Sequence, residues 1–176
     1  WVAKHFTRVN VQINQGHYTA QAFITTDQDD NQITAFHPGA MNLAHEPPIS
    51  EAKEIKVAII APDGREGMIQ HAEQLKAAGI PFIFDPGQGL PMFNGDELMA
   101  FAEQASYIAL NDYEAQLFMD RTGLPEEEIA RHVEALIITR GAEGSYIYSE
   151  GKRIEIACQK AAQVVDPTGC GDAYRA

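Results

Sequence analysis

The sequence predicts an α/β fold in which helices cover a mainly parallel sheet, with a small antiparallel sheet beside it. From Glu54 onward, short apolar runs of strand length alternate with amphipathic helical patterns, which is typical of a parallel sheet. The run at residues 57–60 is continuously apolar, as expected for a strand buried on both faces. Residues 18–37 are instead rich in threonine, isoleucine and aromatic residues around a polar turn, a pattern that predicts a β-hairpin.

The N-terminal part of the chain is expected to form the small sheet. Its two strands are residues 18–26 and 32–37, joined by a turn rich in aspartate and asparagine. Valine and isoleucine alternate along residues 8–13, so this segment could add a third strand. We therefore divide the chain into a β region, residues 9–41, and an α/β core, residues 42–176.

The core is expected to alternate strands and helices along the chain. Its strands are short and strongly apolar: residues 57–60, 81–84, 107–110 and 136–139. Helices follow the first three, with apolar residues at helical spacing, as in Met68, Ala72 and Leu75. The remaining elements are short: a helix at 125–132 and two antiparallel strands at 145–148 and 153–157. Such alternation predicts a parallel sheet covered by helices on both faces.

Composition excludes several classes of partner. The chain has 176 residues, of which 45% are hydrophobic and 22% charged, as in an ordinary globular protein. Its net charge of −12 would repel nucleic acid and anionic membranes, and no apolar run has membrane-spanning length. The two cysteines, Cys158 and Cys170, indicate a reducing compartment rather than a disulfide framework. We therefore expect a cytoplasmic protein with no nucleic-acid or membrane partner.

The two ends of the sequence predict a fragment of a longer protein. The chain begins at Trp1 without a methionine, and its last residues begin a helical pattern that stops within about two turns.

The segment Asp-Pro-Thr-Gly-Cys-Gly-Asp at residues 166–172 combines backbone freedom with a carboxylate. Gly169 and Gly171 let the backbone turn tightly and present N–H groups to an anion, and a helix start attracts negative charge. Asp172 beside such a site could accept a proton from an attacking hydroxyl. On spacing alone, an ordinary strand–turn–helix junction explains the same residues equally well.

This segment resembles the second signature of the ribokinase (PfkB) family of carbohydrate and nucleoside kinases. The resemblance implies a ribokinase-like three-layer core with a parallel sheet, a small β-sheet lid, and ATP-dependent transfer of a phosphoryl group to a hydroxyl. Gly169, Cys170 and Gly171 match the family's anion hole for the transferred phosphate, and Asp172 matches its catalytic base. Cys170 stands at a variable, usually small position of the signature.

Two earlier segments carry the same resemblance. Asn111-Asp-Tyr-Glu114 resembles the family's Asn-x-x-Glu motif, which implies that Asn111 and Glu114 organise Mg²⁺ and the ATP phosphates. By itself the spacing also fits a helix N-cap followed by a glutamate in the first turn. Each of the three motifs follows a predicted strand, and they occur in the family's order.

The third motif is the segment Thr139-Arg-Gly-Ala-Glu-Gly144. It resembles the family's Thr-x-Gly-x-x-Gly nucleotide loop, which assigns Thr139, Gly141 and Gly144 to ATP binding. Taken alone, the segment also fits a hairpin turn.

The N-terminal hairpin resembles the lid of bacterial adenosine-kinase-like members of the family. Such a lid closes over the acceptor, so Phe36 is a candidate to pack on a sugar or purine face; an inward-facing core position explains Phe36 equally well. The resemblance implies a small-molecule acceptor, a nucleoside such as adenosine before a free sugar such as ribose or fructose, and a homodimer formed through the lid.

A nucleotide-binding or ligand-binding relative without turnover is the non-enzymatic alternative. Asp172 argues against it, because a protein that only binds an anion gains little from a carboxylate facing that anion. The family's segments that hold the acceptor hydroxyls and complete the adenine pocket have no match in this sequence, so the acceptor's identity stays open.

Overall fold

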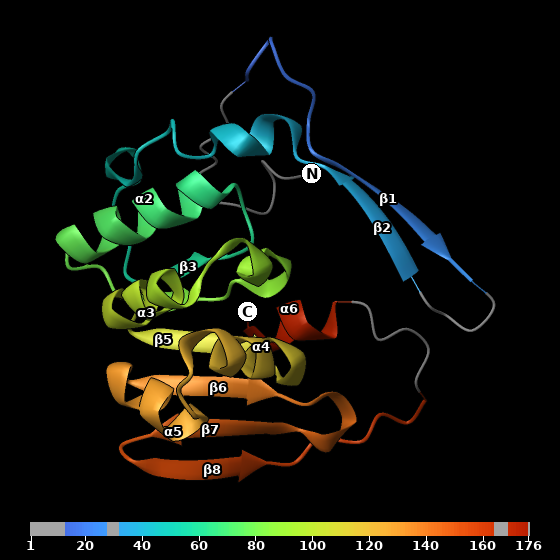
Figure 1. The fold of residues 1–176 in the computed structure, drawn as a ribbon, viewed down its shortest axis with the longest axis vertical. Coiled ribbons are helices and arrows are strands. Elements are labelled where there is room, and N and C mark those ends of the chain that lie inside the picture. Colours follow the sequence, from blue (N-terminus) through green and yellow to red (C-terminus); the bar gives the residue numbers. More distant parts are fainter. Residues whose placement is uncertain (1–12, 28–31, 164–168, 176) are drawn as a thin grey trace.

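The computed structural model describes residues 13–27, 32–163 and 169–175. A six-stranded sheet forms the body of the molecule, and a two-stranded hairpin extends beside it (Figure 1). This arrangement confirms the predicted α/β class with a small separate sheet. The strand expected at residues 8–13 falls almost entirely outside the described residues, as does the first part of the C-terminal signature. Within the described part of the chain, no helix has the length and apolar character needed to cross a bilayer.

The hairpin pairs β1 (Gln21–Thr26) with β2 (Gln32–His37) in antiparallel register. The first strand begins later than the predicted residue 18, because the Tyr18 carbonyl accepts a hydrogen bond from the Ala40 N–H, at 2.8 Å, instead of joining the ladder. Phe36 on β2 is 52% exposed, so the alternative that it packs into the core is wrong.

The main sheet has the strand order β3-β4-β5-β6-β7-β8. These strands are β3 (Ala58–Ile60), β4 (Phe82–Phe84), β5 (Tyr107–Asn111), β6 (Ala135–Thr139), β7 (Ser145–Ser149) and β8 (Lys152–Ile156). The first four are parallel to one another, and the last two pair antiparallel. All six strands lie within about two residues of the predicted positions.

The helices are short and follow the strands closely. They are α2 (Arg65–Ala77), α3 (Gly95–Gln104), α4 (Asp112–Thr122), α5 (Glu126–Ile129) and α6 (Cys170–Arg175). Between these helices and strands, the described residues also form the 3₁₀ turns η1 (Gly39–Leu43), η2 (Ile49–Glu51), η3 (Gly87–Met92), η4 (Ala130–His132) and η5 (Gly141–Glu143). Helix α4 begins where β5 ends, so one short segment joins a buried strand to a helix start.

The crossover helices α2, α3 and α4 lie over the same face of the sheet (Figure 1). Strands β3, β4, β5 and β6 lie in the sheet in the order in which they occur in the sequence, and right-handed crossovers then place the helices that connect them on one side. The opposite face carries Ile59, Ile154 and Ile156, which are 46%, 51% and 43% exposed. The prediction of helices on both faces is therefore met only in part: among the described helices, α6 alone reaches this face, through a hydrogen bond between Tyr174 and Ser145.

The core beneath the crossover helices holds the sheet's carboxyl edge in place. Phe84 stacks on Phe101 of α3 at 4.2 Å between ring centroids, and Phe93 meets Phe101 edge-on at 5.0 Å. In the parallel register, Asn111 at the end of β5 lies beside Thr139 at the end of β6. Residues that follow neighbouring parallel strands therefore meet at one edge, where α/β proteins commonly bind ligands.

Candidate active site

Asn111 and Glu114 hold each other through three hydrogen bonds at the start of α4. The Glu114 N–H donates to Asn111 Oδ1 at 2.7 Å, while the Asn111 backbone N–H and Nδ2 donate to the two Glu114 carboxylate oxygens at 2.8 and 3.0 Å. This capping box fixes the rotamer of a glutamate that is only 8% exposed. The interpretation of Asn-x-x-Glu as a helix N-cap with a glutamate in the first turn is thus confirmed. The same hydrogen bonds hold the buried Glu114 carboxylate at the carboxyl edge of the sheet.

Thr139, Gly141 and Gly144 form the connection from β6 to β7. Thr139 Oγ1 donates to the Leu110 carbonyl at 3.4 Å, which links this loop to the residue before Asn111. The turn closes through a hydrogen bond from the Arg140 N–H to the Gly144 carbonyl at 2.8 Å. The expected hairpin turn is therefore present, and it lies at the same edge as the Asn111–Glu114 pair.

A cavity of about 390 Å³ brings this loop together with the C-terminal segment. Its lining includes Thr139, Gly141, Gly144, Cys170, Gly171 and Tyr174. Two motifs that are distant in the sequence thus share one cavity, whose volume is within the range of small-molecule sites.

The start of α6 carries the remaining predicted residues. Gly169 has φ 79°, a left-handed conformation that favours glycine, and its carbonyl accepts from the Ala173 N–H at 2.9 Å. Cys170 is a free, exposed thiol. Asp172 is exposed in the first turn of α6, so its carboxylate is open to a substrate. Phe36 belongs to β2, which is part of the separate hairpin and not of the sheet that carries the other predicted residues (Figure 1).

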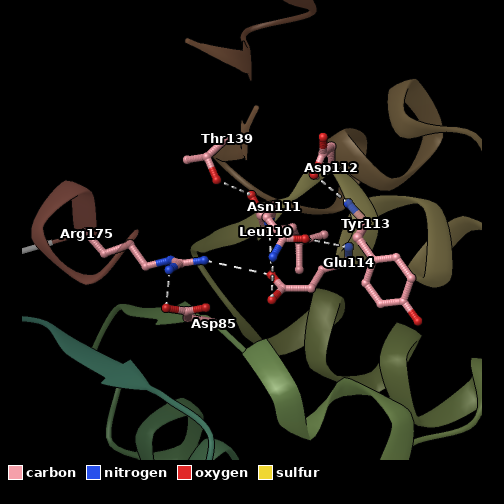
Figure 2. Close-up of polar contacts among 8 residues, drawn as sticks. All are labelled: Asp85, Leu110, Asn111, Asp112, Tyr113, Glu114, Thr139 and Arg175. Carbon is pink, nitrogen blue, oxygen red and sulfur yellow. Dashed lines mark hydrogen bonds and ion pairs between the residues drawn. The ribbon is translucent and has the colours of Figure 1, made fainter. Parts of the chain in front are cut away.

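Asp85 and Arg175 belong to the same site and were not predicted. Figure 2 shows the Arg175 guanidinium between Asp85, which follows β4, and Glu114. Its Nε lies 2.8 Å from Asp85 Oδ2, and its Nη2 lies 3.8 Å from Glu114 Oε2. The sequence held a usable signal for Asp85, which is a carboxylate directly after a buried strand, at the same carboxyl edge of the sheet as Asn111 and Thr139.

The carboxylates at this edge suit a hard cation. Asp85 and Glu114 are both buried and share one guanidinium, and Asp172 lies close enough to raise the pKa of Asp85 further. The oxygen donors and the surplus negative charge fit Mg²⁺. Within the described ranges, no group of three or more histidine, cysteine, aspartate or glutamate side chains is arranged to hold a metal ion.

Asp85→Asn should make the stability of the protein less sensitive to pH. Burial raises the pKa of Asp85 from 3.8 to about 6; Arg175 opposes the shift, and the like charges of Glu114 and Asp172 add to it. A carboxyl with a raised pKa binds its proton more tightly in the folded state, so its stabilising contribution is present below pH 3.8 and is lost as the pH rises through about 6. Urea unfolding between about pH 4 and pH 7 should show the variant gaining stability relative to wild type. A difference in stability between the variant and wild type that stays constant with pH would contradict the raised pKa of Asp85.

Gly144→Ala should destabilise the protein far more than Gly141→Ala. Gly144 has φ 92° and ψ −136°, and an added Cβ would lie 2.0 Å from the Ile156 carbonyl oxygen. Gly141 has φ 53° and no atom within 4 Å of an added Cβ. We expect a loss of about 1–2 kcal/mol for Gly141→Ala, from backbone strain alone, and more than about 3 kcal/mol for Gly144→Ala. Equal losses on chemical denaturation would show that the loop relaxes away from Ile156.

Comparisons with known proteins bear on the whole chain. The pfkB family carbohydrate kinase profile matches residues 7–176. A nucleoside kinase of Methanocaldococcus jannaschii is 35% identical over 98% of this chain and 58% of its own length. The structure of the Burkholderia thailandensis nucleoside kinase in complex with inosine is 58% identical, with a TM-score of 0.86 over 90% of this chain and 53% of that one.

More distant structures share the fold. The ribokinase of Thermotoga maritima is 20% identical with a TM-score of 0.73 over 90% of this chain, which supports the ribokinase-like fold alone. The chain spans little more than half the length of the relatives it matches. The family match and the level of identity are sufficient to assign the family: the chain belongs to the pfkB family of carbohydrate kinases.

Proposed function

We propose that this chain carries the phosphoryl-transfer site of a nucleoside kinase, which moves the γ-phosphoryl group of ATP to a primary hydroxyl of the nucleoside. One observation carries the proposal. The Asn111–Glu114 pair, the glycine loop after Thr139 and the start of α6 with Asp172 converge on the carboxyl edge of the same sheet. A kinase needs these three functions together: a metal-organising carboxylate, a nucleotide cavity and a base.

The nucleotide would occupy the cavity between the β6–β7 connection and α6. Gly141, Gly144 and Gly171 are part of the lining on both sides of this cavity, and because glycine has no side chain, backbone N–H groups at these positions can approach the phosphates closely. The loop Gly169 to Gly171 would then stabilise the charge that develops on the transferred phosphoryl group.

Asp172 would act as the base. Its exposed carboxylate accepts the proton of the acceptor hydroxyl as that oxygen attacks phosphorus, and the hydroxyl becomes the new phosphoester oxygen. Glu114, held by Asn111, would hold the shell of a Mg²⁺ ion, which when bound neutralises the phosphate charge. Capping fixes Glu114 before any ligand arrives, so little rearrangement is needed to receive the ion.

A nucleoside is favoured as acceptor over a free sugar. The Burkholderia thailandensis kinase, 58% identical, has been solved in complex with inosine and with ADP-inosine. Phe36 and Ile24 lie on one face of the hairpin and are 52% and 57% exposed, so this face is suited to pack on a base. A hairpin that closes over the acceptor would also exclude water from the transfer.

The other face of the hairpin is proposed to form a homodimer. Phe23 and Ile33 lie on it and are 62% and 78% exposed, and exposed apolar patches commonly mark protein interfaces. Sedimentation of the whole protein should then give the mass of two chains; a monomer would remove this part of the proposal.

The free thiols of Cys158 and Cys170 are consistent with a cytoplasmic enzyme.

The acceptor is tested by measuring ADP release from ATP with inosine, adenosine, ribose and fructose. We expect kcat/KM for the better nucleoside to exceed that for ribose by at least about tenfold, because the sugar lacks the base that contacts the hairpin. A preference for ribose or fructose would make the protein a sugar kinase. ATP binding without phosphorylation of any acceptor would make it a non-catalytic relative.

A further inference from the structure

Arg175 is a buried cation shared by two carboxylates from different elements. The exposed fraction of its side chain is 14%, and those of Asp85 and Glu114 are 9% and 11%. Burying an arginine without a partner is costly, so the guanidinium depends on these two contacts. We call Asp85, Glu114 and Arg175 the guanidinium bridge.

Two of the three nitrogens of the Arg175 guanidinium face carboxylates. Nε lies 2.8 Å from Asp85 Oδ2, and Nη2 lies 3.8 Å from Glu114 Oε2. An arginine that binds a transferring phosphate directs its guanidinium fork at that phosphate. Because this guanidinium is directed at two carboxylates of the protein, the geometry favours a role in which Arg175 acts on the protein.

Two consecutive side chains attach helix α6 to the sheet. Tyr174 donates to or accepts from Ser145 of β7 at 2.8 Å, and Arg175 reaches the end of β4 on the other side of β5 and β6. Consecutive side chains thus fix the helix to the sheet from two directions.

Asp172 stands three residues before Arg175, so the two lie on the same side of α6. Glu114 and Asp172 both act as like charges on Asp85. Without Arg175 these carboxylates would repel one another, and α6 would move away from the sheet edge. Because α6 carries Asp172, that movement would also take the base away from Glu114.

We propose that Arg175 is a positioning residue: through the guanidinium bridge it sets the distance between Asp172 on α6 and Glu114 on α4. The inference rests on the proposed kinase function and adds a residue that the chemistry itself does not require. Displacement of a reacting group by about 1 Å costs on the order of 10²-fold in rate. The effect of losing Arg175 should therefore appear in kcat rather than in ATP binding.

The test is a double-mutant cycle on the whole protein, with Arg175→Gln, Asp85→Asn and the two combined. Each single change should lower kcat by about 10–100-fold, with KM for ATP changed by less than about threefold. If Arg175 acts through Asp85, the combined variant should be no more than about threefold slower than the slower single variant. Arg175→Lys, which keeps the charge but not the fork, should recover part of the loss.

Arg131→Gln is the matched control. Arg131 also pairs with a carboxylate, that of Glu128, but it lies on the surface with 71% of its side chain exposed. The kcat of this variant should equal that of wild type. Hydrogen exchange of the α6 amides gives a readout independent of activity, and protection should fall in Arg175→Gln. If the losses of kcat multiply in the combined variant, Arg175 acts independently of Asp85, on the substrate, and the inference is overturned. Unchanged hydrogen-exchange protection of α6 in Arg175→Gln would also overturn it. A wild-type protein that phosphorylates no acceptor, yet loses α6 protection in Arg175→Gln, would refute the proposed function while supporting the bridge.

Discussion

Asp172→Asn is expected to lower kcat by about 10²–10⁴-fold while ATP binding is retained. Asparagine has nearly the same shape as aspartate but cannot accept the proton of an attacking hydroxyl. The attachments of α6 run through Tyr174 and Arg175, which this change leaves in place. The loss should therefore fall on the chemical step, and nucleotide titration of the variant should give nearly the wild-type dissociation constant.

Asp120→Asn is the control for this result. Asp120 is exposed on α4 and accepts a hydrogen bond from Gln116 at 2.8 Å, so turnover should match wild type. If Asp172→Asn retains wild-type turnover, Asp172 is an ordinary residue of a helix start and the base must be sought elsewhere.

Glu114→Gln is expected to lower activity by about 10–100-fold at fixed Mg²⁺ and to raise the Mg²⁺ concentration needed for half-maximal rate. Glutamine has one carbonyl oxygen, so it can still accept one of the two hydrogen bonds that Asn111 donates, and it removes the negative charge beside Arg175. The helix start is thus largely preserved while the ligand for a hard cation is weakened. Initial rates across a Mg²⁺ series, at saturating ATP, measure both effects.

The chain contains a matched control for the structural part of this change. Helix α3 begins with the same capping box, in which the Asn94 N–H donates to Glu97 at 2.9 Å and the Glu97 N–H donates to Asn94 at 3.0 Å. Glu97→Gln should alter stability much as Glu114→Gln does, yet leave the Mg²⁺ dependence unchanged. Equal shifts in both variants would mean that Glu114 acts only as a cap.

Local chemistry explains why most elements could be predicted from the sequence. Asn111 and Glu114 form a helix start whose partners are three residues apart, and strands such as β5 have an apolar, buried centre, here residues 108–110. The turn at Gly144 likewise depends on a backbone conformation that favours glycine. Signals of this kind lie within a few neighbouring residues, so they can be read without knowing the fold.

Features that depend on strand order could not be read in this way. The crossover helices share one face because the parallel strands β3 to β6 lie in the sheet in their sequence order, without a reversal of that order. The pairing of Asp85 with Arg175 joins the end of β4 to the last described turn of the chain. Nothing near Asp85 in the sequence indicates a cationic partner, and the exposure of Phe36 depends on how the hairpin sits beside the sheet.

The central claim is that the three motifs at this sheet edge transfer a phosphoryl group to a nucleoside. It is tested most directly by incubating the whole protein with inosine and ATP labelled at the γ-phosphorus, and by identifying the labelled product. We predict label on the primary hydroxyl of inosine, in an amount equal to the ADP released, and its loss in Asp172→Asn. Label that appears only as inorganic phosphate, or on ribose but never on a nucleoside, would contradict the account.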